Sequence, residues 1–532
     1  MSRVAQSALL APFLIASVLL AAPHPAQAQM AESVISPSGR LRIEVAPTFH
    51  LWERRFGEDG SEPLGFDLEN QPLVPVADLQ QLLRSALADP SLSLVLGSAR
   101  AEVTRERSRV NLGLALGVFD WLTIGANVPL VSARTEVAFD FRALPGTNLG
   151  PNPFFFGDGS AAAFLGTLDS SRGALQQRVA QTCPNGAASG ASCPGLVDLL
   201  ARYTTFAGGL ATAYGVSPVF VTAGSPAGGA LQQRMNGFRT EIQAKAPGVA
   251  TPGAAPHAAA PVTQTSVRQA LIDPAAGLFL VSPFENTATG WRVGDVELSA
   301  ALRALHGEVR DSARAPARIR YQVGGQALVR LPTGTVDHPD VPLDLGTGDG
   351  QLDVELSAFA DVRVGRVGLH AEAGYGVQRP TDVVRRVAPP EMVMAPFYTR
   401  VPTRWTPGSY RQLDLAPRWH LTDAFAIGAL YRFHHKDRDS YELLQAVPSP
   451  FSAADLERET EETAQEIGAG LAFSTLGSWE EGRTSFPFEA RVSVRKAVAG
   501  SGGMTPDGLR MEATARLFWR IWGAEPTPAG AR

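Results

Sequence analysis

Several residue types are scarce in this 532-residue chain, and their scarcity limits what the protein can be. Only three of its 47 basic residues are lysines, which we attribute to a GC-rich genome rather than to function. The net charge of −5 excludes the strongly basic surface of a nucleic-acid-binding protein. The only two cysteines, Cys183 and Cys193, are too few thiols for a metal site, and no histidine lies near them in sequence. We predict that they form one local disulfide, and we expect no metal and no cofactor.

Long apolar runs are missing as well, except at the amino terminus. Residues 1–28 combine an early Arg3, an apolar stretch and an Ala26-Gln27-Ala28 cleavage site, which is the pattern of a cleaved secretory signal peptide. No cysteine follows that site, which argues against a lipoprotein. The rest of the chain has no run of about 18 apolar residues, so we expect no transmembrane helix.

What the chain does contain is a two-residue alternation of apolar and polar side chains, clearest in residues 353–378. Valine, leucine and alanine occupy one face of this segment, while acidic residues, His370 and Arg363 occupy the other. This period is typical of β-strands, and the two-residue turn Gly365-Arg366 closes an antiparallel hairpin. A soluble sandwich would show the same alternation, but alternating segments in an exported chain without membrane helices favour an outer-membrane barrel.

The same alternation predicts twelve strands along the chain. They are 41–53, 99–118, 122–141, 291–305, 316–331, 353–365, 367–378, 410–421, 424–435, 464–475, 485–498 and 509–522. We therefore predict an all-β membrane protein: a 12-stranded antiparallel transmembrane β-barrel in the bacterial outer membrane. Its partners would be outer-membrane lipid and lipopolysaccharide. The alternative is a periplasmic all-β protein with a half-buried sheet.

The connections between these strands alternate in length. The predicted inner turns are short: 119–121, 306–315, 366, 422–423 and 476–484. The predicted outer loops are mostly long: 54–98, 142–290, 332–352, 379–409, 436–463 and 499–508. Short periplasmic turns and long extracellular loops are the rule in such barrels. Tryptophans near strand ends fit the interfacial girdles of a membrane barrel; they are Trp52, Trp121, Trp291, Trp419, Trp479, Trp519 and Trp522.

The large outer loop divides the exported chain into a first barrel part (29–141), an insertion (142–290) and the barrel remainder (291–532). The insertion carries only fourteen charged residues, so we expect it to pack as a partly helical extracellular cap or plug that restricts the pore. A loose surface insert is the alternative. Predicted helices are Val76–Ala88 in the first outer loop, and Ala201–Tyr214 and Leu231–Ala244 in the insertion. Residues 245–263 are typical of a Pro/Ala linker.

Several short motifs resemble one family. Arg330-Leu-Pro-Thr-Gly334 followed by Leu345-Gly-Thr-Gly348 resembles the outer-membrane proteins associated with the meta-cleavage pathway of phenol degradation. Val293-Gly294-Asp295-Val296 is similar to their Gly-Asp strand opening, although Arg292 stands where a further glycine is expected. Gly117–Leu122, which leads into Val128–Val131, is similar to their first inner hairpin. The likeness excludes 142–290, and it implies a barrel with a transporter-like role.

The polar faces of the predicted strands carry charges of both signs. Opposite charges on neighbouring strands would brace a wet interior, and a charged conduit would filter solutes by sign; both roles remain open. The candidate lumen residues are Arg318, Arg320, Arg330, Asp353, Glu355, Asp361, His370, Glu372, Glu489, Arg491, Arg495, Arg510, Glu512 and Arg516, with His420 as polar filler.

Two function classes follow from this pattern. The first is a passive channel for small molecules, with aromatic or hydrophobic compounds among the candidates if the family association holds. The second is a non-conducting barrel whose cap binds a surface partner. We predict no enzyme, because no histidine of the exported chain has the His-x-Ser-Asn setting of the outer-membrane phospholipase. An acid-rich outer loop, Asp337 to Asp353, is the one candidate for a cation site.

Overall fold

A computed structural model describes most of the chain from Val34 to Gly523. The described residues are 34–57, 60–68, 76–142, 144–184, 193–272, 280, 286–310, 318–341, 343–390, 392–393, 395–503 and 505–523. The predicted signal peptide lies outside them.

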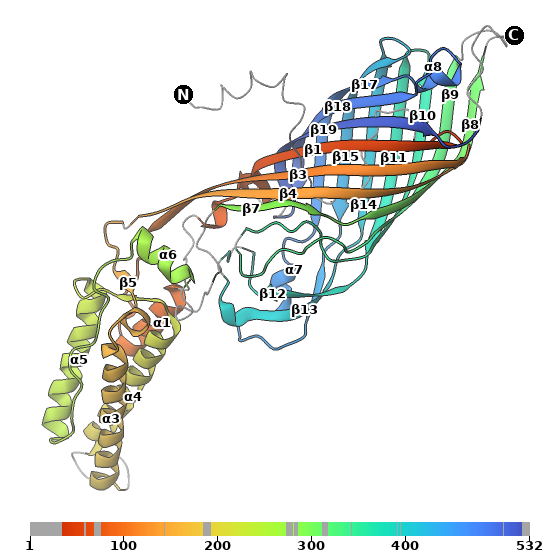
Figure 1. Ribbon diagram of the computed structural model, residues 1–532. Coiled ribbons are helices and arrows are strands. Elements are labelled where there is room, and N and C mark those ends of the chain that lie inside the picture. The colour runs from red at the N-terminus through yellow and green to blue at the C-terminus, as the bar shows by residue number, and fades with distance from the viewer. Residues whose placement is uncertain are drawn as a thin grey trace.

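Twelve antiparallel strands form a closed barrel (Figure 1). Successive barrel strands are hydrogen-bonded to one another, and the last pairs with the first, with Ala515 opposite Val45, so the ring is complete. The barrel strands are β1 (Arg40–Gly57), β3 (Ser98–Phe119), β4 (Leu122–Arg142), β8 (Glu297–Val309), β9 (Ile319–Arg330), β10 (Asp353–Val364), β11 (Val367–Gln378), β14 (Tyr410–His420), β15 (Phe425–Lys436), β17 (Glu462–Ser474), β18 (Phe488–Ser501) and β19 (Thr505–Arg520). The predicted fold class is confirmed.

The barrel wall has the reverse polarity of a soluble protein. Leu356 and Trp519 are 61% and 67% exposed on its outer surface, whereas the carboxylate of Asp353 is fully buried on the other face. Soluble proteins bury the first kind of residue and expose the second. A closed antiparallel sheet that is apolar outside and polar inside is the architecture of bacterial outer-membrane barrels.

The remaining elements belong to the loops, which gather mainly at one end of the barrel (Figure 1). They are β2 (Gly60–Pro63), η3 (Phe66–Leu68), α1 (Val76–Leu87), β5 (Leu149–Pro151), α2 (Pro153–Phe156), α3 (Ser160–Thr182), α4 (Cys193–Val216), β6 (Val219–Val221), α5 (Pro226–Lys245), α6 (Gln264–Ile272), β7 (Thr287–Val293), β12 (Thr381–Arg386), η6 (Phe397–Thr399), β13 (Arg400–Thr406), β16 (Ser440–Leu443), α7 (Ala453–Glu457) and α8 (Leu476–Glu480). We call this end the loop end and the opposite one the turn end. The predicted loop 499–508 is instead a short turn, because β18 and β19 extend into it.

The predicted strand 291–305 is interrupted. The structure divides it into β7 and β8, which pair with different parts of β4 on either side of Pro129. Proline has no N–H to donate to a neighbouring strand, so a regular ladder cannot continue through this position. Only the Gly294 N–H reaches across, donating to the Pro129 carbonyl at 2.8 Å. The break leaves residues 294–296 at the barrel wall outside both strands, where the Val296 carbonyl accepts the Leu331 N–H at 2.8 Å.

Two of the predicted girdle tryptophans do not face lipid. Trp52 is 6% exposed and packs against the ring of His50 on the inner face of β1. Trp479 is equally buried, and the Arg40 guanidinium lies 4.5 Å from the centre of its ring. Trp52 points inward because it has the strand parity of His50, and Trp479 belongs to the short helix α8. The other predicted girdle residues, Trp121, Trp291, Trp419, Trp519 and Trp522, are exposed.

Helices from two different loops share one hydrophobic core at the loop end. Leu79 and Leu83 of α1 pack into the same core as Leu210 of α4, and Gly209 lets the two helices approach closely at Ala86. Helix α4 buries residues at helical spacing, as expected for one apolar face. The predicted helices in 76–88, 201–214 and 231–244 are confirmed. We call α1, α3, α4 and α5 the helical unit.

The stretch 245–263 belongs to this unit rather than acting as a loose linker. Its Pro256 carbonyl accepts a hydrogen bond from the Tyr214 hydroxyl, and Ala258 forms a β-bridge with Thr222. Ala255 and Val262 are buried in the common core.

The helical unit projects away from the barrel at its loop end (Figure 1). Helices α3, α4 and α5 share one core with one another and with α1. Their place in Figure 1 is that of the expected cap rather than of the expected plug. No described helix is long and apolar enough to cross a bilayer. Cys183 and Cys193, which flank the residues between α3 and α4, are joined by a disulfide with Cα atoms 5.6 Å apart.

We expect Leu356→Arg to destabilise the folded barrel by about 2–4 kcal/mol, because it places a charge on the lipid-facing side of β10. Ser357→Arg is the matched control, since its side chain points to the polar face. Urea titration of the protein in lipid vesicles measures both variants. Equal losses at the two positions would contradict the assignment of the two faces.

Replacing both cysteines by serine should destabilise the helical unit by roughly 2–3 kcal/mol, because the bond closes a loop of about ten residues in the unfolded chain. The measurement is the thermal unfolding of the helical signal by circular dichroism. The strand signal serves as an internal control and should keep its transition. A helical transition at the same temperature in both proteins would refute the prediction.

Candidate functional site

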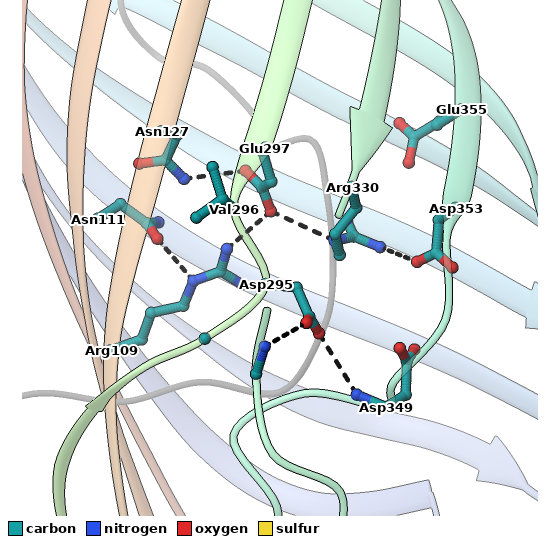
Figure 2. Close-up of polar contacts among 12 residues, drawn as sticks. Arg109, Asn111, Asn127, Asp295, Val296, Glu297, Arg330, Asp349, Asp353 and Glu355 are labelled. Atoms are coloured by element: carbon teal, nitrogen blue, oxygen red, sulfur yellow. Dashed lines mark hydrogen bonds and ion pairs between the residues drawn. The ribbon is translucent and has the colours of Figure 1, made fainter. Parts of the chain in front are cut away.

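The inner face of β3, β8, β9 and β10 carries a chain of ion pairs (Figure 2). Arg109 donates to a Glu297 oxygen at 2.7 Å, and the Arg330 guanidinium lies 3.4 Å from the same oxygen. Arg330 also pairs with Asp353 on the next strand. All four residues are buried. Because β4 lies between β3 and β8, Arg109 reaches Glu297 across the inner face of an intervening strand.

Two asparagines complete this arrangement. Asn111 accepts a hydrogen bond from the Arg109 Nε at 2.6 Å, and Asn127 donates to the second Glu297 oxygen at 2.9 Å. Figure 2 shows both amides beside the pair they hold. Charged groups removed from bulk water need such partners to offset their desolvation. Glu297, which the sequence analysis did not select, is therefore the centre of this cluster.

The break between β7 and β8 anchors the 331–352 loop. Asp295 accepts the backbone N–H groups of Gly334 at 2.8 Å and Asp349 at 3.3 Å. Figure 2 shows Asp295 and Asp349 next to the ion-pair chain. Burial, and to a lesser extent the charge of Asp353, raise the pKa of the Asp349 carboxyl above its ordinary value.

The same loop covers inward-facing residues of β3 and β4. Arg107 donates to the Gly346 carbonyl at 3.2 Å, and Thr135 donates to the Leu343 carbonyl at 3.1 Å. Thr135 is buried. The loop therefore folds over the inner side of the wall at the loop end of the barrel.

Arginines from a neighbouring loop pair with the acidic residues that the sequence analysis named as a candidate cation site. Asp337 pairs with Arg385 at 2.5 Å, and Asp340 pairs with Arg386 at 2.7 Å and Arg400 at 3.1 Å. No metal-binding group of His, Cys, Asp or Glu occurs in the described part of the chain. The carboxylates instead attach the 379–409 loop to the 331–352 loop.

A second cluster lies on β10, β11 and β14. Asp361 contacts His370 Nδ1 at 2.9 Å and Arg418 at 2.8 Å. His370 Nε2 lies 3.7 Å from the Glu372 carboxylate. In a catalytic triad this nitrogen would face a nucleophile instead. Glu355 accepts a hydrogen bond from the Tyr410 hydroxyl at 2.9 Å.

The opposite part of the wall carries a third cluster centred on Arg495. This side chain pairs with Glu512, and it lies 3.7 Å from Glu466 and 3.9 Å from Asp414. Asp414 is held by Arg432 at 2.7 Å. The remaining contacts are Arg491 to Glu512 at 3.6 Å, Arg510 to Glu466 at 3.5 Å, and Arg516 to Glu44 at 2.6 Å and to Glu489 at 3.5 Å.

Charge of each sign is concentrated on a different side of the barrel. The buried charged residues described on β8–β11 are mostly acidic: Glu297, Arg330, Asp353, Glu355, Asp361 and Glu372. Those described on β14–β19, β1 and β3 are mostly arginines: Arg40, Arg109, Asp414, Arg418, Arg432, Glu466, Glu489, Arg491, Arg495, Arg510, Glu512 and Arg516. A solute between the two walls would meet opposite charges on its two sides.

Two of the candidate lumen residues do not join these clusters. Arg318 precedes β9 and is exposed, and Arg320 pairs with Glu308 and Glu481 at the turn end. Both were expected beside Asp353, Glu355 and Asp361. The reason is that β9 runs along the wall from the turn end to the loop end. Arg320, near its start, lies opposite Arg363, and only its last residue, Arg330, lies opposite Asp353.

Several members of the clusters were not selected from the sequence. They are Glu44, Arg109, Glu297, Tyr410, Asp414, Arg418, Arg432 and Glu466. All of them lie on predicted strands, so the same alternation would have placed the charged ones on the polar face. The sequence could not predict which of these side chains contact one another, because contacts across an intervening strand depend on the curvature of the barrel.

Comparison with known proteins gives only distant likenesses. No family model and no curated protein matches the chain. Among solved structures, an outer-membrane channel from Pseudomonas putida F1 is 8% identical, with 91% of this chain and 97% of that chain covered and a TM-score of 0.39. The toluene transporter TodX of Pseudomonas putida is 8% identical over 92% of this chain and 90% of that chain, with a TM-score of 0.22. Likeness at this level transfers no function to this chain.

Arg495→Met should destabilise the barrel by about 3–5 kcal/mol, because it leaves three buried carboxylates without their shared counter-charge. Arg411→Met is the control: Arg411 pairs with Asp437 at an exposed site, where an ion pair contributes less than about 1 kcal/mol. Denaturant titration in vesicles compares the variants. A loss at Arg495 no larger than at Arg411 would show that the third cluster is solvated like a surface.

Proposed function

We propose that this chain is a passive channel for small solutes in the outer membrane of a Gram-negative bacterium, exported by a signal peptide that is cleaved after Ala28. The observation that carries this proposal is the polarity of the closed wall, which buries charged side chains inside and exposes apolar ones outside. Outer-membrane barrels that enclose a water-filled channel have a polar interior of this kind. Lipid and lipopolysaccharide would surround its outer surface.

We infer that the solutes are small and polar. A solute in the lumen would pass charged groups such as Arg330, Glu355 and Arg495. An aromatic or hydrophobic compound would separate these groups from their polar partners and could not offer hydrogen bonds in exchange. Aromatic or hydrophobic solutes, which the phenol-degradation resemblance implies, remain the alternative. The acidic and basic walls favour solutes that carry both signs of charge, because each end of a dipole then meets its complement.

The second candidate is a barrel whose helical unit binds a surface partner. The observation in its favour is that the unit projects away from the barrel, on a hydrophobic core that also includes residues at the loop ends of β3 and β4. Such a unit could be displayed whether or not the barrel conducts. The two proposals differ in one measurable property, which is permeation by the purified protein.

Shortening the 331–352 loop by replacing residues 336–345 with a Gly/Ser linker should raise single-channel conductance in planar bilayers at least about twofold, since this loop covers the inner wall. The matched variant removes helices α1 and α3–α5 together, and we expect no change in its conductance. Folding of both is checked by their resistance to SDS before heating. Folded protein that conducts in neither form would favour the partner-binding candidate.

A further inference from the structure

The chain turns back into the barrel immediately before β1. Gly39 adopts a left-handed conformation with φ of +73°, and its N–H donates to the Gly117 carbonyl at 2.8 Å. A side chain at Gly39 would collide with the backbone of Trp522, so glycine is needed here for both reasons. The residues that precede it, Val34–Ser38, therefore do not leave along the strand axis.

The first three of these residues, Val34, Ile35 and Ser36, are buried inside the barrel. Val34 and Ile35 are each only 4% exposed, and they share a small core with Ala301 of β8 and Phe359 of β10. Phe359 is unusual, because it lies on the inner face of β10 between the inward-facing Ser357 and Asp361. Its ring fits only because position 324 on β9 is glycine, where a Cβ would lie 2.4 Å from it. Phe359, Ala301 and the space beside them thus form an apolar socket in the polar lumen.

Few polar contacts hold the segment. The Ser36 N–H donates to the Thr123 hydroxyl at 2.9 Å, and Arg42 donates to the Val34 carbonyl at 3.2 Å. The Pro37 carbonyl lies against Gly117, where a Cβ would come within 2.1 Å of it. Each of these groups could bind water instead if the segment withdrew.

The segment also borders the cavity at the turn end. This cavity of about 260 Å³ is lined by Ile35, Ser36 and Pro37 on one side, and by Asp361 and Arg418 of the second cluster on another. His306 and Arg320, at the rim of the turn end, line it as well. The segment therefore lies between the rim and the buried charges of the lumen.

We propose that Val34–Ser38 is a built-in plug that closes the turn end of the lumen and opens it by withdrawing from the Phe359 socket. The proposal rests on the proposed channel function. Two aliphatic side chains and a few hydrogen bonds hold the plug, so local release leaves the strand ladder of the barrel intact. The socket accepts aliphatic side chains, because it offers an aromatic ring and the methyl group of Ala301.

Two variants of the full chain test the plug from its two sides. Ile35→Asp places a charge in the apolar socket, and Gly117→Val fills the space that the Pro37 carbonyl occupies. Gly113→Val is the matched control, because it is an inward glycine of the same strand whose nearest neighbour is the flexible Glu44 side chain at 3.3 Å. We expect both plug variants to conduct at least fivefold more than the parent and the control to match the parent. Conductance raised equally in the control would overturn the proposal, and so would unchanged conductance in both folded plug variants if a thiol placed in the lumen is also labelled no faster.

A second readout separates this proposal from the channel function. Ser357→Cys places a thiol on the lumen side of Phe359, and the native cysteines are disulfide-bonded. The rate at which a small methanethiosulfonate reagent labels this thiol should rise at least fivefold when Ile35→Asp is added. Faster labelling without conductance would support the plug and refute the channel, whereas an unchanged labelling rate would refute the plug.

Discussion

Closure of the backbone ladder between β19 and β1 is the constraint on which the rest of the structure depends. Lipid offers no partner to an unpaired N–H or carbonyl group, so a membrane sheet must pair its last strand with its first. In this chain the register Val45–Ala515 completes that pairing. Once the ring is closed, the parity of a residue on its strand decides whether it meets lipid or the interior. The inversion of polarity between Leu356 and Glu355 follows directly from it.

A closed ring gathers charges from many strands in one enclosed space, and each then needs a partner. Arg109 reaches over β4 to Glu297, and Arg495 approaches Asp414 although two strands lie between their own. Such contacts tie distant parts of the wall together. They also leave these side chains almost inaccessible, so the clusters brace the wall in this structure, and a passing solute would have to displace some of their contacts.

Different segments of the chain enter the barrel at its two ends. At the loop end, Asp295 lies in the break of the wall opposite Pro129, and it holds the 331–352 loop inward by accepting two of that loop's backbone N–H groups. At the turn end, Val34 and Ile35 enter the interior beside Phe359. The helical unit, by contrast, buries its apolar surface within itself and against loop-end residues of β3 and β4, such as Ala101 and Phe141, and stands apart from the lumen. Length alone therefore says little about which loop controls access.

The sequence by itself determined the strands, the closed barrel and the helices near 76–88, 201–214 and 231–244. Strand and helix periodicities are local signals, and each apolar face must be buried against lipid or protein. The sequence also placed residues such as Arg330 and Glu512 on the polar face. Only the tertiary structure decided that Arg318 and Arg320 stay at the rim, that the helical unit leaves the lumen, and that Val34 and Ile35 enter it. Those outcomes depend on the tilt of strands around a curved wall and on contacts between segments far apart in the chain, neither of which leaves a periodic signal.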